Sequence, residues 1–178
     1  LRREEKVLIS GVGGGVALMA CQMAIAIGAE VYVSSSDPDK IEKAVSIGAK
    51  GGANYKNPED MKKLASDVGG FNVIIDSAGG EGFQTLLKMC TMGGRIAIYG
   101  GTAGNIKNLT VPNIFFKQLS ILGSTMGSDQ EFEKMLEFVH HYNIVPIVDE
   151  VFELENGQAG LNKLADGGQF GKIVYNIV

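Results

Sequence analysis

The feature that most restricts the fold of this chain is a regular alternation between short apolar runs and longer segments of helical period. Such alternation is typical of βαβ units built around a parallel sheet. We predict strands at residues 6–10, 30–35, 51–55, 71–76, 95–99 and 119–124. We predict helices at residues 16–27, 38–47, 59–67, 81–90, 112–118 and 128–142, with Val16, Ala20, Met23 and Ile27 forming the inner stripe of the first helix.

The predicted strands are apolar along nearly their whole length, as in "FNVIID" at residues 71–76. A strand that is covered on one face alternates polar and apolar residues, so a continuous apolar run indicates helices on both faces of the sheet. The sequence therefore predicts an α/β fold with a doubly wound parallel sheet. Ligands of such sheets bind beyond the carboxyl ends of the strands, and we look for functional residues there.

After Pro146 the rhythm changes to a strand at 148–154, a helix at 156–166 and a strand at 171–177. A length of 178 residues, with 45% apolar and 20% charged residues, suits one globular domain over residues 1–178. A net charge of −4 without a basic block argues against a nucleic-acid partner.

The two cysteines, Cys21 and Cys90, lie far apart in apolar surroundings, which indicates buried thiols rather than a disulfide framework or a zinc motif. The chain opens on the charged stretch "LRREEK", which does not resemble a secretory signal. We expect a reducing, cytoplasmic location.

Residues 7–29, "VLISGVGGGVALMACQMAIAIGA", contain no charged residue and are long enough to span a membrane. Glycines in the middle of such a span would weaken it, whereas a strand, a turn and a helix each fit their own part of the stretch. We therefore favour the soluble alternative and expect no membrane partner.

The glycines lie where the first strand ends and the first helix begins. Free N–H groups and the helix dipole at that position attract anions such as phosphate. The spacing from Gly11 does not match G-x-G-x-x-G, because Val16 stands at the last position, whereas Gly11, Gly14 and Ala17 recur regularly. A purely structural turn remains the alternative, and no G-K-[ST] follows to make a Walker loop.

The end of the second predicted strand distinguishes between dinucleotides. NAD-binding Rossmann units place an acid about 20 residues beyond the glycines to bind the ribose 2′-hydroxyl. Here Ser34, Ser35 and Ser36 stand in its place, and hydroxyls accommodate a 2′-phosphate that a carboxylate would repel. Lys40 lies close enough to reach that phosphate, although it equally fits a solvated helix lysine, and Asp37 suits a helix cap.

Several ordered motifs resemble those of one family: the glycine stretch itself, "DKIEKAVSIGAKGGANYK", "FNVIIDSAGG", "GGRIAIYGG" and "VFELENGQAGLNKLADGGQFGKIVYNI". Together they resemble the cofactor domain and C-terminal tail of medium-chain dehydrogenases/reductases, in the quinone oxidoreductase and zinc-type alcohol dehydrogenase-like branch. The resemblance implies a Rossmann domain that binds NADP(H). It also implies an oxidoreductase that transfers hydride to or from a small-molecule carbonyl or activated double bond, and a homodimer formed through the sheet edge near the sixth strand.

The resemblance assigns cofactor contacts to four regions of the chain. Along the pyrophosphate it places Gly13, Gly14, Gly15, Val16 and Ala17. Beside the 2′-phosphate it places Ser35, Lys40 and Tyr55, with Ser36 adjoining. In the cofactor cleft it places Ser77, and beside the nicotinamide Gly100, Gly101, Thr102, Gly123, Ser124 and Thr125, which without the resemblance would be interpreted as turn residues.

Members of this family carry a GroES-like domain before the first Rossmann strand. This chain starts just before that strand, so we expect a truncated oxidoreductase whose residues 148–178 would pack on the missing domain. No zinc signature is present, and His140 and His141 suit a solvated helix end, so we expect no metal and no catalytic residue within the chain.

Three alternatives remain to be weighed. Short-chain dehydrogenases need a Tyr-x-x-x-Lys pair, and no tyrosine of the chain has a lysine four residues later. Methyltransferases generally carry an acid where Ser35 stands. The third alternative is a nucleotide-binding module without catalysis.

Overall fold

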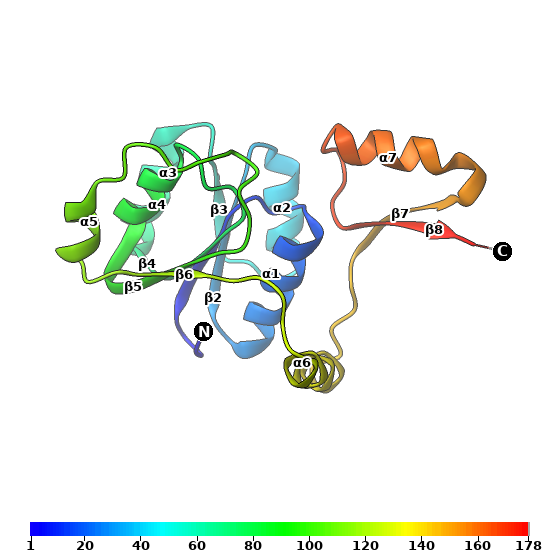
Figure 1. Ribbon diagram of the computed structural model, residues 1–178, viewed down its shortest axis with the longest axis horizontal. Helices are drawn as coiled ribbons and strands as arrows, with labels where there is room; N and C mark the ends of the chain where they lie inside the picture. Colours follow the sequence, from blue (N-terminus) through cyan, green and yellow to red (C-terminus); the bar gives the residue numbers. More distant parts are fainter. Residues whose placement is uncertain (178) are drawn as a thin grey trace.

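The computed structural model describes residues 1–177, and its main body is a six-stranded sheet flanked by helices (Figure 1). The strands are β1 (Lys6–Ile9), β2 (Glu30–Ser35), β3 (Gly51–Asn54), β4 (Phe71–Asp76), β5 (Cys90–Ile98) and β6 (Ser120–Gly123). All pair in parallel, in the order β3-β2-β1-β4-β5-β6. This order confirms the predicted doubly wound Rossmann sheet, and its switch point lies between β1 and β4.

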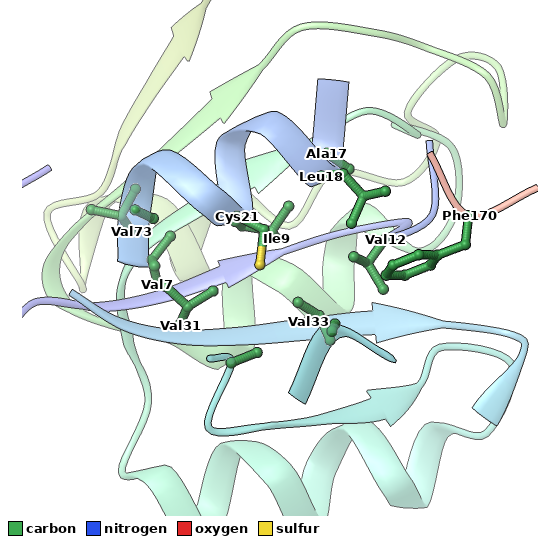
Figure 2. Close-up of a cluster of buried hydrophobic side chains, with 13 residues drawn as sticks. Val7, Ile9, Val12, Ala17, Leu18, Cys21, Val31, Val33, Val73 and Phe170 are labelled. Carbon is green, nitrogen blue, oxygen red and sulfur yellow. The ribbon is translucent and has the colours of Figure 1, made fainter. Parts of the chain in front are cut away.

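Helices cover both faces of this sheet, which confirms the prediction drawn from the apolar strands. The helices of the main body are α1 (Gly15–Ile27), α2 (Pro38–Ser46), α3 (Pro58–Val68), α4 (Phe83–Met89) and α5 (Val111–Phe115). Val7 and Ile9 of β1 pack in a cluster with residues of α1 and α2, which Figure 2 shows. Leu8, between them, packs in a second cluster with residues of α3 and α4, because successive strand side chains point to opposite faces.

The helix ends follow the chemistry of their capping residues. Asp37 accepts a hydrogen bond from the Asp39 amide at 2.9 Å and caps α2, and Gly28 ends α1 in the left-handed conformation, at φ +87°, both as predicted. Asn57 caps α3 in the same way ahead of Pro58. This repeated cap explains why α3 begins before the predicted residue 59.

The inner face of α1 differs from the predicted stripe. Its buried residues are Ala17, Leu18, Cys21 and Ala24, whereas Val16 is 58% exposed. Val45 of α2, also predicted to face inward, is 43% exposed. In α1 the error arises because apolar residues surround the helix, so that periodicity does not single out the inner face.

Residues 7–29 do not form one long helix: they contain β1, the glycine turn and α1, which has 13 residues. Within residues 1–177, none of the helices combines the length and the apolar character that crossing a membrane requires. The stretch therefore divides into a strand, a turn and a helix, which is the arrangement that the sequence favoured.

The C-terminal part forms a small unit apart from the main sheet (Figure 1). Helix α6 (Asp129–His141) leads into β7 (Val148–Glu153), a 3-10 turn (Leu154–Asn156), α7 (Gly157–Ala165) and β8 (Lys172–Asn176). β7 and β8 pair in parallel with each other as a separate two-stranded sheet, and we call β7, α7 and β8 the tail unit. Its elements match those predicted from residues 148–177.

The loop between α7 and β8, and the segment before β7, contact α1 and the glycine turn. Phe170 is only 6% exposed and belongs to the cluster of β1, β2 and α1, where Figure 2 shows it beside Val12. The Gly171 amide donates to the Gly13 carbonyl at 3.1 Å, and Gln22 Nε2 donates to the Val145 carbonyl at 2.8 Å. Phe170 and Gly171 thus lie against the same turn that the sequence singled out.

Candidate functional site

A cavity of about 530 Å³ opens at the carboxyl ends of the parallel strands. Its lining includes Ser10 and Gly11 after β1, Ser34 of β2, Tyr55 after β3, and Ser77 after β4. The cavity therefore lies at the switch point between β1 and β4, where doubly wound sheets bind their ligands.

The glycine turn beside this cavity has a backbone that only glycine adopts readily. Gly11 has φ +69° and Gly13 has φ +122°. A Cβ added at Gly13 would lie 2.8 Å from Lys40 Cδ, so both the conformation and the space favour glycine. Gly14 caps α1 without a side-chain hydrogen bond, and the first turn of α1 contains no acid. The backbone amide groups of the first turn of α1 are therefore available to an anion.

The end of β2 brings the predicted 2′-phosphate residues to one place. The register pairs Ser35 with Asn54, so Tyr55 follows directly on the neighbouring strand, and its ring is 49% exposed beside the cavity. Ser35 is 4% exposed, and its Oγ accepts from the Asp37 amide at 3.1 Å, which leaves the hydroxyl hydrogen free to donate.

Lys40 reaches from α2 over the glycine turn. Its Nζ lies 3.3 Å from a Cβ built at Gly13 and donates to the Gly167 carbonyl at 2.5 Å. Lys40 is therefore not the free solvated lysine considered as an alternative, because it links the turn to the segment before β8.

A buried acid that the sequence analysis did not single out organises the neighbouring loop. Asp76, 1% exposed at the end of β4, accepts from Ser10 Oγ at 2.5 Å and from the Gly79 amide at 2.8 Å. Ser10 Oγ in turn accepts from the Ser77 amide at 3.2 Å. The only sequence signal for Asp76 is that a lone acid ends a largely apolar strand.

The loop after β5 closes against the loop after β4. Thr102 donates from its amide to the Ser77 carbonyl at 3.3 Å, and a Cβ at Gly100 would lie 2.6 Å from that same oxygen. Gly100 therefore has a packing reason to be glycine, and Thr102 lines the cavity. Burial raises the pKa of the hydroxyl of Tyr99, which follows β5 in the same loop.

Other predicted site residues lie outside the cavity. Gly123, Ser124 and Thr125 are exposed at the end of β6, an edge strand. Val16 is exposed at the start of α1, and the Ala17 side chain is buried, which leaves only its backbone to face a ligand. Gly101 precedes the cavity residue Thr102 without lining the cavity itself, and Ser35, Ser36 and Lys40 also lie outside its lining.

The sheet order, the glycine turn that opens α1 and the cavity at the switch point define the class of Rossmann dinucleotide-binding domains. Residues 15–141 match the family described as zinc-binding dehydrogenase, and the chain belongs to that family. It therefore represents the NAD(P)-binding domain of an oxidoreductase family, as its resemblance implied.

Known proteins similar to this chain are about twice as long. The zinc-type alcohol dehydrogenase-like protein YogA of Leptosphaeria maculans is 33% identical over 96% of this chain and 50% of that protein. A crystal structure of an NAD-dependent alcohol dehydrogenase superposes with a TM-score of 0.90 at 34% identity, over 99% of this chain and 52% of that one. The quinone oxidoreductase of Thermus thermophilus, solved also in complex with NADPH, superposes with a TM-score of 0.83 at 25% identity. This superposition covers 99% of this chain and 58% of that one.

The family description mentions zinc, but the described residues fit a dinucleotide and not a metal. No group of three or more His, Cys, Asp and Glu side chains within residues 1–177 is arranged to hold a metal ion. The left-handed glycines and the uncapped start of α1, in contrast, form the backbone cradle that a diphosphate needs.

Proposed function

We propose that this chain binds NADP(H) and is the cofactor domain of an oxidoreductase acting on a carbonyl or an activated C=C bond. The observation that carries the proposal is the row of serines at the end of β2, where NAD-specific units carry an acid. Asp37, the nearest acid, is engaged in capping α2 and does not replace it.

Each part of the site has a distinct role in this proposal. The backbone of the glycine turn, from Gly13 to Ala17, binds the pyrophosphate. Ser35, Ser36, Lys40 and Tyr55 bind the 2′-phosphate, and the 530 Å³ cavity beside Ser77 receives the adenosine. The nicotinamide side is assigned to Gly100, Gly101, Thr102, Gly123, Ser124 and Thr125.

When bound, the nicotinamide supplies or accepts the hydride. The chain's own residues bind and orient: the Asp76 network fixes the β4–α4 loop, and Thr102 fixes the β5 loop against it. We assign the substrate pocket, and any catalytic acid or metal, to a GroES-like domain outside these residues.

We also propose that residues 148–178 pack on that GroES-like domain. The exposed apolar residues of the tail unit support this proposal. Val151 of β7 and Leu161 of α7 are more than half exposed, at 59% and 55%. Apolar surface of this kind marks a contact with another protein surface. We also propose a homodimer, because β6 is an exposed edge strand that a second copy can contact. The two free, buried cysteines support the expected cytoplasmic location.

Calorimetric titration of the 178-residue chain with NADPH, NADH and S-adenosylmethionine tests the proposal. We expect NADPH to bind at least about tenfold more tightly than NADH, since the 2′-phosphate adds charge-assisted contacts. We expect no heat from S-adenosylmethionine. Equal affinity for NADPH and NADH would contradict the 2′-phosphate assignment, and binding of S-adenosylmethionine alone would contradict the class of ligand.

A further inference from the structure

The tail unit contains the single Asn-Gly pair of the chain, at residues 156 and 157. Asn156 ends the 3-10 turn (Leu154–Asn156), and Gly157 is the first residue of α7. Asn156 is exposed, and its side chain makes no capping hydrogen bond to α7. The side-chain amide of Asn156 is therefore free to react with the backbone nitrogen that follows it.

Gly157 has no conformational or packing reason to be glycine. Its φ of −53° and ψ of −34° are ordinary helical values, and a Cβ added there would lie 3.7 Å from Tyr175 Cε1, a normal van der Waals contact. Gly171 in the same part of the chain, in contrast, has φ +126° and leaves no room for a Cβ beside the Ile147 carbonyl. The consequence of a glycine at position 157 is instead chemical, because without a Cβ its amide nitrogen can approach a neighbouring group closely.

An asparagine followed by glycine can lose ammonia without any enzyme or cofactor, which makes such asparagines thermolabile. The Gly157 nitrogen attacks the Asn156 side-chain carbon Cγ, a new C–N bond forms, and the side-chain nitrogen leaves as ammonia with the Gly157 amide proton. Water then opens the resulting five-membered imide at either of its two carbonyl carbons, which yields aspartate or isoaspartate. One water molecule is consumed and one ammonia released, and nothing is oxidised or reduced.

The folded tail unit slows this reaction without preventing it. The Gly157 amide hydrogen, which must leave during the attack, is donated to the Leu154 carbonyl. The Gly157 carbonyl accepts from the Tyr175 hydroxyl at 3.0 Å, which links the start of α7 to β8. The turn itself has only three residues, and all three are exposed, so it can open without unfolding the rest of the tail unit.

We infer that Asn156 is a site of spontaneous deamidation, limited by opening of the turn Leu154–Asn156, that adds one negative charge to the start of α7. Aspartate suits this position, because the first turn of α7 contains no acid and the N-terminus of a helix favours negative charge. Isoaspartate instead adds a carbon atom to the main chain and disturbs the turn. Leu154, which is 56% exposed in the same turn, then lies beside a new charge.

Incubation of the 178-residue chain in mildly alkaline buffer, followed by peptide mapping with mass spectrometry, tests this inference. We expect the mass change from amide to carboxyl in the peptide that contains Asn156, as both aspartate and isoaspartate. Gly157→Ala fits the structure, and we expect it to slow the change by at least about tenfold, because the added methyl group hinders the nitrogen. Asn162, also exposed on α7 but followed by Lys163, is the internal control and is expected to remain intact.

Tyr175→Phe tests the role of turn opening, because it removes the hydrogen bond to the Gly157 carbonyl and keeps the ring. We expect deamidation about fivefold faster than in the wild type, the effect of one lost hydrogen bond on the open population. A synthetic peptide of residues 150–163 is the unfolded reference and should react faster still. Circular dichroism verifies that each variant is folded.

The outcomes distinguish the parts of the inference. If Asn156 in the folded wild type is unchanged when the peptide has reacted completely, or if Asn162 reacts as fast as Asn156, the deamidation site is wrong. If the wild type, Tyr175→Phe and the peptide all react at one rate, the limiting role of the turn is wrong. None of these measurements involves a dinucleotide, so neither result bears on the proposed function.

Discussion

In the proposed site, Lys40 is the side chain on which we expect selectivity between the two dinucleotides to depend most. Its ammonium group already donates to the Gly167 carbonyl. A phosphate bound at the end of β2 would therefore make a further contact with a side chain that is already ordered. We expect Lys40→Ala to weaken NADPH by about 1.5–3 kcal/mol, the value of a charge-assisted hydrogen bond, and to leave NADH nearly unchanged. Titration of both cofactors measures this, and an equal loss for both would show a structural role.

The two cysteines provide a second test at single positions. Cys21 and Cys90 are 0% and 3% exposed, and burial raises the pKa of each thiol to about 11. At pH 8 only about one thiol in a thousand is then ionised, and the thiolate is the reactive form. We expect neither thiol to react with a disulfide reagent in the folded chain and both to react in denaturant. Rapid reaction of one thiol in the native chain would contradict the packing of α1 or of the α4–β5 junction.

Among the elements, the tail unit depends on one partly buried carboxylate, that of Asp149, whose side chain is 14% exposed. Asp149 of β7 accepts from the Phe170 amide and lies 2.6 Å from Lys163 Nζ of α7. The Lys163 ammonium is the main reason that the pKa of Asp149 lies below its usual value of 3.8. A carboxyl with a lowered pKa stabilises the fold above its unfolded pKa, and this stabilisation disappears as the pH falls through the folded pKa.

We therefore expect Asp149→Asn to reduce the free energy of unfolding by about 1 kcal/mol at pH 7, and the difference from wild type to shrink below about pH 4. Urea unfolding between pH 3 and pH 7 measures both effects. Glu150→Gln is the matched control, because Glu150 shares Lys163 but its side chain is 46% exposed. A loss that is independent of pH would show that Asp149 acts through shape rather than charge.

The strands and helices could be predicted closely because their signals are local. The caps at Asp37 and Gly28 each depend on a few neighbouring residues, and the structure has both. β5 instead begins at Cys90, ahead of the predicted residue 95, because its pairing with β4 is irregular between Phe71 and Val73. Such irregular pairing depends on a partner strand distant in sequence and has no local signal.

The same distinction applies to the site. The glycine turn and the serines of β2 are contiguous motifs, and their place at the carboxyl ends of the strands follows from the fold class. The bond from Ser10 to Asp76 joins residues 66 positions apart. The bond from Lys40 to Gly167 depends on how the tail unit folds back. Neither follows from spacing in the sequence.

At the scale of the whole molecule, the exposed strand β6 leads to a prediction about association. β6 is one of the two outer strands of the main sheet, and Ile121 and Leu122 on it are 38% and 50% exposed. Exposed apolar edge strands pair readily with a second copy, and a lysine on the edge prevents this. We expect sedimentation velocity to detect a dimer of the chain and Leu122→Lys to shift it to monomer.

The matched control for this prediction is Val45→Lys on α2, another exposed apolar position. A second comparison separates two surfaces, because Val151→Lys changes the tail unit and leaves β6 intact. If Val151→Lys, and not Leu122→Lys, abolishes association, the contact is made by the tail unit.

The hydrogen bond between Lys40 and Gly167 joins positions 127 residues apart. During translation, the glycine turn and the serines of β2 leave the ribosome long before the carbonyl that Lys40 binds. Until then Lys40 lacks this partner, and Val12 lacks the cover of Phe170. A premature stop codon after residue 166 would retain every glycine and serine of the motif and still disturb the surroundings of both. The segment that contains Gly167 and Phe170 therefore contributes to the surroundings of glycine and serine motifs that all lie within residues 11–36.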